Sequence, residues 1–198
     1  MFVEIIDSCM QTLISFLKND LEFSEELALE ISAFYEAQLL NKNNYLVKQG
    51  QYCRKMCLIE KGYFRFFSYT DKKVVTHWIF GKNQLVTDVS SFFLQIPAKW
   101  NIQALTDTAV FTLTHTNYQK LREKIPEWDN YEKLFLVKLM SALENRVYAF
   151  LSMSAEERYQ YLFAADSDMF NELPLQYLAS MLGMTPETLS RIRRKFTI

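Results

Sequence analysis

The stretch 173–196 constrains the fold of this chain most strongly, because its spacing fits two short helices joined by a tight turn. Pro174 suits the first turn of a helix, where its missing N–H would have no partner. Gly183 can adopt the left-handed conformation that ends a helix, and Thr185 followed by Pro186 is typical of a new helix start. The pattern therefore predicts one helix on each side of Gly183.

Each of these two predicted helices has one apolar side. We expect the first to end at Met181 or Leu182 and the second to begin at Pro186, and the small Ala179 lets them approach closely. The apolar positions are Leu175, Leu178, Ala179, Leu182, Leu189, Ile192 and Phe196. This combination is the helix-turn-helix pattern, whose second helix enters the major groove of DNA.

The end of the chain is locally basic, although the net charge of all 198 residues is only −1. From residue 185 onward, the chain contains one acidic residue, Glu187, and four basic residues, Arg191, Arg193, Arg194 and Lys195. We therefore expect these basic side chains to contact DNA phosphates. The same residues also fit an αα-hairpin with a solvated basic face, in which Glu187 pairs with Arg191 four residues later.

The sequence shows no sign of membrane insertion or export. No apolar run approaches the length needed to cross a bilayer, and Glu4 and Asp7 stand where a signal peptide would be basic. We therefore expect a cytoplasmic protein with no membrane partner.

Metal sites and disulfides are not indicated either. Cys9, Cys53 and Cys57 are odd in number and lack a matching second pair, so buried or inert thiols are expected. His77 and His115 are far apart in sequence and belong to no metal-binding motif, which argues against a metalloenzyme built on a small β-barrel.

The remaining pattern predicts an α+β fold. Residues 3–17 and the stretch from Ser24 to Leu40 predict two N-terminal helices. Short apolar runs broken by turn residues then predict an antiparallel, jelly-roll-like β-roll. Its expected strands are 45–47, 57–59, 63–69, 74–80, 101–105 and 109–113.

Helices return after the predicted β-roll. Thr116 or Asn117 is expected to cap a short helix ending at Lys124, and a long helix follows over 127–151. This long helix is apolar on several sides, more than one β domain can cover, so a second copy of the chain is expected to cover the rest. The expected dimer-interface residues are Leu136, Leu139, Leu143, Val147 and Phe150.

We thus predict a β-roll domain with N-terminal helices over 1–126, a dimerisation helix over 127–151 and a helix-turn-helix domain over 152–198. Within the last part, Ser154 caps a helix that runs to about Ala165. Asp166, Ser167 and Asp168 are expected to break it.

This order of parts resembles the Crp/Fnr family of bacterial transcription regulators. The resemblance is most specific in Leu178–Arg191, LASMLGMTPETLSR, and is supported by LIEKGYFR at 58–65 and NIQAL at 101–105. It implies a homodimeric, sequence-specific DNA-binding regulator that is not an enzyme. The implied partners are double-stranded DNA and RNA polymerase.

The resemblance also implies which residues contact DNA. In the family, a glutamate and an arginine one helical turn apart read base edges, and Glu187 and Arg191 occupy these positions. Pro186 stands where some members carry another base-reading arginine, so the preferred half-site is expected to differ. Contacts to the DNA backbone are expected from Gln176, Thr185, Thr188, Ser190 and Arg194.

The chain departs from the family in the cassette that holds a cyclic nucleotide. Thr87 and Asp88 fall where the family has Gly-Glu, and Ala98 and Lys99 fall where it has Arg-Ser. These changes remove a close backbone approach and a bidentate phosphate contact, so we expect no cyclic nucleotide. The N-terminal cysteine cluster of the family's iron-sulfur branch is reduced here to Cys9, so no other cofactor is expected either. An effector pocket, if used, would be bordered by Val86 and these four residues.

Two other functions fit parts of the pattern. A cyclic-nucleotide-dependent activator would use Lys99 as a point charge for the phosphate. A protein-interaction module would use the basic C-terminal helices on an acidic partner, and its binding would not weaken steeply with salt as DNA binding does.

Overall fold

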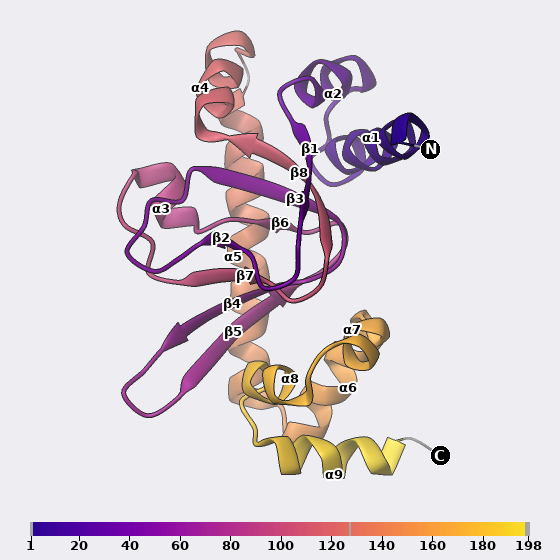
Figure 1. Cartoon of the computed structure of the whole chain (residues 1–198), viewed down its shortest axis with the longest axis vertical. Helices are drawn as coiled ribbons and strands as arrows, with labels where there is room; N and C mark the ends of the chain where they lie inside the picture. Colours follow the sequence, from indigo (N-terminus) through magenta and orange to yellow (C-terminus); the bar gives the residue numbers. More distant parts are fainter. Residues whose placement is uncertain (1, 127, 197–198) are drawn as a thin grey trace. The chain divides into compact units, whose positions relative to one another are not determined.

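The computed structural model describes residues 2–126 and 128–196, with side chains from Met10 onward (Figure 1). The chain forms two compact units. The first contains the residues up to Phe66 together with Phe80–Leu136, and the second contains Phe67–Ile79 and the chain from Val137. Helices and antiparallel strand pairs are combined, which confirms the predicted α+β class. In the described residues, no helix is long and apolar enough to cross a membrane.

The first unit begins with helices α1 (Phe2–Asn19) and α2 (Glu25–Ser32). Ser24 caps α2 as predicted, accepting a hydrogen bond from the backbone N–H of Leu27 at 3.3 Å. The prediction that this helix reaches Leu40 is wrong, because Glu36–Leu40 is strand β1 and pairs with β8. Its residues favour helices locally, and the pairing overrides that preference.

Two four-stranded sheets follow, with strand orders β1-β8-β3-β6 and β2-β7-β4-β5. All six predicted strands are present. The bounds are β2 (Tyr45–Val47), β3 (Lys55–Lys61), β4 (Phe64–Tyr69), β5 (Val74–Phe80), β6 (Leu85–Val86), β7 (Asn101–Ala104) and β8 (Thr108–Thr114). The two-residue strand β6 and the short helix α3 (Val89–Leu94) were not predicted, since neither is long enough to show a period.

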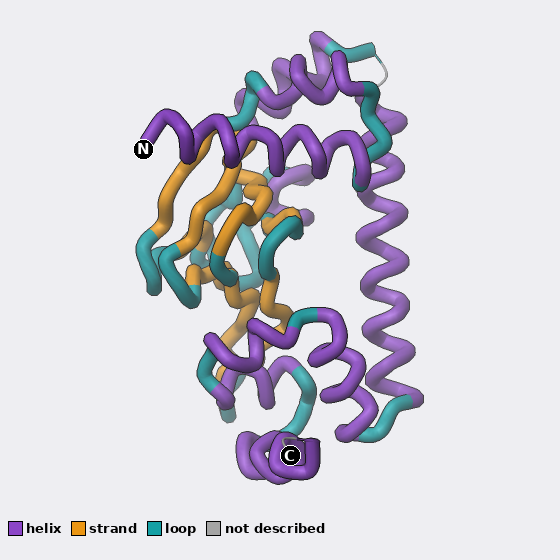
Figure 2. The backbone as a smooth tube through the Cα atoms, turned by 90° about the vertical axis from the view of Figure 1, so that its right-hand side faces the viewer, coloured by secondary structure: helices purple, strands orange, loops and turns teal. Residues whose placement is uncertain are grey.

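Strand β3 separates the two apolar cores of the first unit. Met56 and Leu58 face a core built with α1, α2 and α4, whereas Cys57 and Ile59 face the space between the sheets. Successive side chains of a strand point to opposite faces. Both faces of β3 are buried because helices cover its outer side, and Figure 2 shows α1 running across these strands.

The helical half of the chain begins with α4 (His115–Lys124). Thr114 caps it, with its hydroxyl oxygen 3.1 Å from the backbone nitrogen of Asn117, so the predicted caps Thr116 and Asn117 are wrong. Strand β8 runs directly into the helix, which moves the cap to the last strand residue.

The predicted long helix is α5 (Trp128–Ser152), which is uninterrupted (Figure 2), and Glu127 lies outside the described residues. Ser154 caps α6 (Ala155–Ala165) in a capping box with Glu157, as predicted. Asp166 ends α6, but Ser167 and Asp168 are wrongly predicted as a break, because Asp166 also caps α7 (Ser167–Glu172).

Candidate nucleic-acid interface and nucleotide cassette

Helices α8 (Leu175–Met181) and α9 (Pro186–Phe196) confirm the predicted pair of helices and the turn between them. Gly183 has a φ of +69°, the left-handed conformation expected of it. The N–H of Met184 donates to the carbonyl of Ala179 at 3.0 Å, and the N–H of Gly183 donates to that of Ser180 at 3.2 Å. This hydrogen-bond pattern is the Schellman motif, which satisfies the last carbonyls of α8 and sets the direction in which α9 begins.

Two arginines outside the predicted site also bind the end of α8. Arg146 Nη2 donates to the carbonyl of Met181, and Arg158 Nε donates to that of Leu182, each at 3.1 Å. Cations are favourable at the carbonyl end of a helix, where the dipole is negative. Burial lowers the pKa of Arg146 to about 10, so its guanidinium stays charged at neutral pH.

The same end of α8 meets the outer part of the β4–β5 hairpin, which belongs to the second unit. The N–H of Thr76 donates to the hydroxyl of Ser180 at 2.9 Å. The guanidinium of Arg146 lies 4.5 Å from the ring centre of Trp78 and 4.9 Å from that of Phe150. No pattern in the sequence indicates these contacts, because they join residues far apart in the chain.

Helix α9 has one buried side and one exposed side. Leu189 and Ile192 are fully buried. Glu187, Arg191 and Arg194 are exposed and fall within an arc of about 60° on the opposite side, at about 100° per residue. The two predicted base-reading side chains therefore share one accessible face with Arg194, one of the predicted phosphate-binding residues.

The two side chains of the proposed base-reading pair, Glu187 and Arg191, are accessible. The pKa of Glu187 is lowered by a hydrogen bond from its own backbone and by a second from the Thr185 hydroxyl. Within the described chain, no ion pair joins Glu187 to Arg191, so the alternative in which they neutralise each other is not observed. Both side chains are open to solvent.

The predicted backbone-contacting residues differ in exposure. Gln176, Thr185 and Arg194 are exposed, whereas Thr188 and Ser190 are half-buried. Thr185 caps α9, because its hydroxyl oxygen lies 3.2 Å from the backbone nitrogen of Thr188. All five lie on α8, on α9 or at the turn between them.

The predicted dimer stripe is exposed along α5. Leu143 and Val147 are 54% and 50% exposed, and the neighbouring Val137 and Met140 are 59% and 58% exposed. Leu136, Leu139 and Phe150 are less open. Phe150 also packs within its own chain, since a Cβ placed on Gly183 would lie 2.7 Å from its ring.

The cassette of the β-roll is closed by its own hydrogen bonds. Asp88 caps α3 and is 2% exposed, with Oδ1 accepting from the N–H of Ser91 at 3.0 Å and Oδ2 from that of Lys99 at 3.1 Å. Thr87 donates to the backbone carbonyl of Lys55 at 2.9 Å. Ala98 is buried and is paired through its backbone with Gln51.

Two backbone donors of the cassette are therefore engaged within the chain, because the Asp88 carboxylate accepts from the N–H groups of Ser91 and Lys99. Val86 belongs to the core between the sheets, and the ammonium of Lys99 is exposed. The five predicted pocket residues are therefore close in the fold, but four of them are buried against the protein itself.

The thiols and imidazoles form no metal site in the part of the chain that is described. Cys53 and Cys57 are buried, and burial raises the pKa of Cys57 to about 12, which fits the predicted inert thiols. The side chain of Cys9 lies outside the described residues. His77 Nε2 is 3.0 Å from the Ser68 hydroxyl, and His115 packs edge-on against Phe92.

Comparison with known proteins identifies the fold. Residues 37–124 match the sequence profile of the cyclic nucleotide-binding domain. The catabolite activator protein of Thermus thermophilus is 18% identical, with a TM-score of 0.55 over 92% of this chain and 86% of that one. FixK2 of Bradyrhizobium japonicum is 14% identical, with a TM-score of 0.67 over 82% and 84%.

A CooA mutant from Carboxydothermus hydrogenoformans is 20% identical, with a TM-score of 0.61 over 93% of this chain and 83% of that one. No curated protein matches the chain in sequence. Residues 37–124 are therefore similar to the cyclic nucleotide-binding domain, and the chain shares the fold of the Crp/Fnr-type catabolite activator protein, FixK2 and CooA.

Proposed function

We propose that this protein is a sequence-specific, DNA-binding transcription regulator and not an enzyme. It acts as a homodimer in the bacterial cytoplasm and contacts RNA polymerase at its promoters. Residues 152–198 bind DNA, α5 joins the two copies, and the β-roll is the sensor or its retained scaffold.

The observation that carries this proposal is the exposed face of α9, on which Glu187, Arg191 and Arg194 stand together. A short helix held by a rigid turn and carrying such side chains fits the major groove. Arginine can bond both acceptors of guanine, and a carboxylate can accept from cytosine. Apolar contact with a protein partner would not require this polar face.

Selection from random DNA tests the proposed function. We expect one near-palindromic sequence whose half-sites are centred about 34 Å apart, because a two-fold dimer presents two recognition helices. Affinity for this sequence should fall steeply as salt rises, since phosphate contacts release counterions. Recovery of unrelated sequences, or binding that salt does not weaken, would contradict DNA recognition.

A cyclic-nucleotide-dependent activator is the second candidate, and the match of residues 37–124 to the cyclic nucleotide-binding domain favours it. The closed cassette around Asp88 argues against it. We expect cyclic AMP and cyclic GMP to leave both the unfolding temperature and DNA affinity unchanged. A ligand present at 100 times its Kd would stabilise the fold by about 2.7 kcal/mol, which thermal unfolding detects easily.

A further inference from the structure

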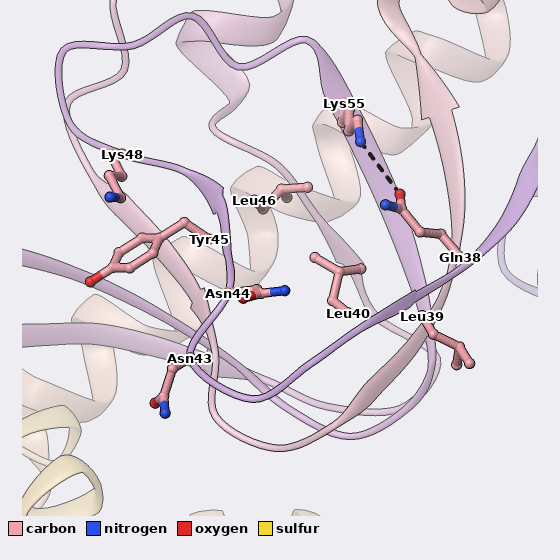
Figure 3. A pocket seen from close by; sticks show the side chains of 9 residues that line it. All are labelled: Gln38, Leu39, Leu40, Asn43, Asn44, Tyr45, Leu46, Lys48 and Lys55. Atoms are coloured by element: carbon pink, nitrogen blue, oxygen red, sulfur yellow. Dashed lines mark hydrogen bonds between the residues drawn. The ribbon is translucent and has the colours of Figure 1, made fainter.

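A groove of about 560 Å³ opens between strands β1 and β2 of the first unit (Figure 3). Each of these strands stands at the end of its sheet, so neither is covered by a further strand on that side. Nine residues line the groove and none of them is acidic. Its volume falls in the range of about 300–1,000 Å³ that is usual for small-molecule sites.

The turn between β1 and β2, which lines the groove, is fixed by hydrogen bonds. The N–H of Lys42 donates to Asp107 Oδ1, and the N–H of Asn43 donates to the carbonyl of Ala104, both at 2.8 Å. Gln103 Nε2 donates to the carbonyl of Asn43 at 3.1 Å. This side of the groove is therefore ordered before a ligand binds, which lowers the entropic cost of binding.

The groove offers hydrogen-bond donors from Gln38 and Asn44. Gln38 Oε1 accepts from Lys55 Nζ at 3.4 Å and from the Thr112 hydroxyl at 3.3 Å. The amide N–H groups of Gln38 are therefore left for a ligand. Figure 3 shows the amide nitrogens of Gln38 and Asn44 directed toward the space beside Leu40.

The charge of the groove is positive. The ammonium of Lys48 lies 4.8 Å from the ring centre of Tyr45, and the ammonium of Lys55 donates to the neutral amide of Gln38. Among the described residues, no carboxylate pairs with either ammonium. Leu40, which is buried, and Leu46, which is partly buried, add an apolar surface.

We propose that this groove binds a small organic anion, namely a carboxylate or phosphate ester that carries an apolar body. The oxyanion accepts from Lys55, Gln38 and Asn44, and the apolar body lies on Leu40 and Leu46. The site is formed by β1, β2 and β3 and does not use the Asp88 cassette. It does not depend on the proposed DNA binding, so either proposal can fail alone.

Titration of the full-length protein with benzoate and phenyl phosphate at constant ionic strength tests the proposal, with binding followed by NMR. At least one anion should bind saturably and shift the side-chain amide signals of Gln38 and Asn44. Benzamide, the neutral counterpart of benzoate, should bind about tenfold more weakly or worse, because hydrogen bonds to charged groups are stronger.

Matched variants complete the test. The double variant Lys48→Met, Lys55→Met keeps the side-chain length but removes both charges, and it should lose affinity by about tenfold or more. Lys42→Met removes a nearby exposed charge outside the groove lining and should bind like the wild type, as should Lys99→Met in the cassette. No saturable binding by either anion, equal affinity for benzamide, or loss of binding only in Lys99→Met would overturn the proposal.

Discussion

Leu143→Glu is expected to convert the protein to a monomer and to weaken binding to its full DNA site by a factor of about 10²–10⁴. Leu143 is 54% exposed within the apolar stripe of α5. In a two-fold dimer, the substitution removes two buried leucines, at about 1.5–3 kcal/mol each, and places two negative charges at the interface. A monomer contacts only one half-site, so it loses the additional affinity that a dimer obtains by binding both half-sites at once.

Sedimentation measures the oligomeric state, and DNA affinity is measured at the same salt concentration. Leu94→Glu is the matched control, because Leu94 is 68% exposed at the end of α3 and is not a member of the stripe. It should leave both the dimer and DNA affinity unchanged. Circular dichroism checks that helix content is retained. A dimer that persists in Leu143→Glu would show that α5 is not the interface through this stripe.

Arg191→Ala is expected to lower affinity for the preferred DNA sequence by about 1–3 kcal/mol, a factor of about 5–150. The loss should be confined to sequence reading. Base preference should relax at one position of each half-site, while binding to unrelated DNA changes little. The physical reason is that the planar guanidinium bonds two acceptors of one base, whereas phosphates carry no sequence information.

Arg194→Ala is the control for Arg191→Ala, because both arginines are exposed on the same face of α9. Loss of a phosphate contact should weaken binding to all sequences about equally and reduce the salt slope by about 1. Arg191→Lys should not restore the base preference, since lysine lacks the bidentate geometry. If selection from random DNA gives the same sequence preference with Arg191→Ala as with the wild type, Arg191 does not read a base.

The local signals of the sequence predicted the α8–α9 pair almost to the residue. A proline in the first turn, a glycine in the left-handed conformation and a threonine cap act within a few residues of one another, so no distant contact is needed to interpret them. The strands were also predictable, since their apolar alternation reports burial directly. The same holds for the caps at Ser24 and Ser154.

Features that depend on distant partners were not predictable. Glu36–Leu40 has the local preferences of a helix and becomes a strand because β8 pairs with it. Neither Arg146 nor Arg158 carries a sequence signal for binding the carbonyls that end α8. The groove between β1 and β2 likewise exists only because the strand order leaves both strands at sheet edges.

The cassette illustrates which features can be inferred from the sequence and which require the tertiary structure. From the sequence, the resemblance to the Crp/Fnr family indicated that Thr87, Asp88, Ala98 and Lys99 replace the groups that hold a cyclic nucleotide in that family. Only the tertiary structure showed that the Asp88 carboxylate takes the backbone donors of Ser91 and Lys99. Residue types establish which interactions are possible, but the folded backbone decides which donors and acceptors come within hydrogen-bond distance.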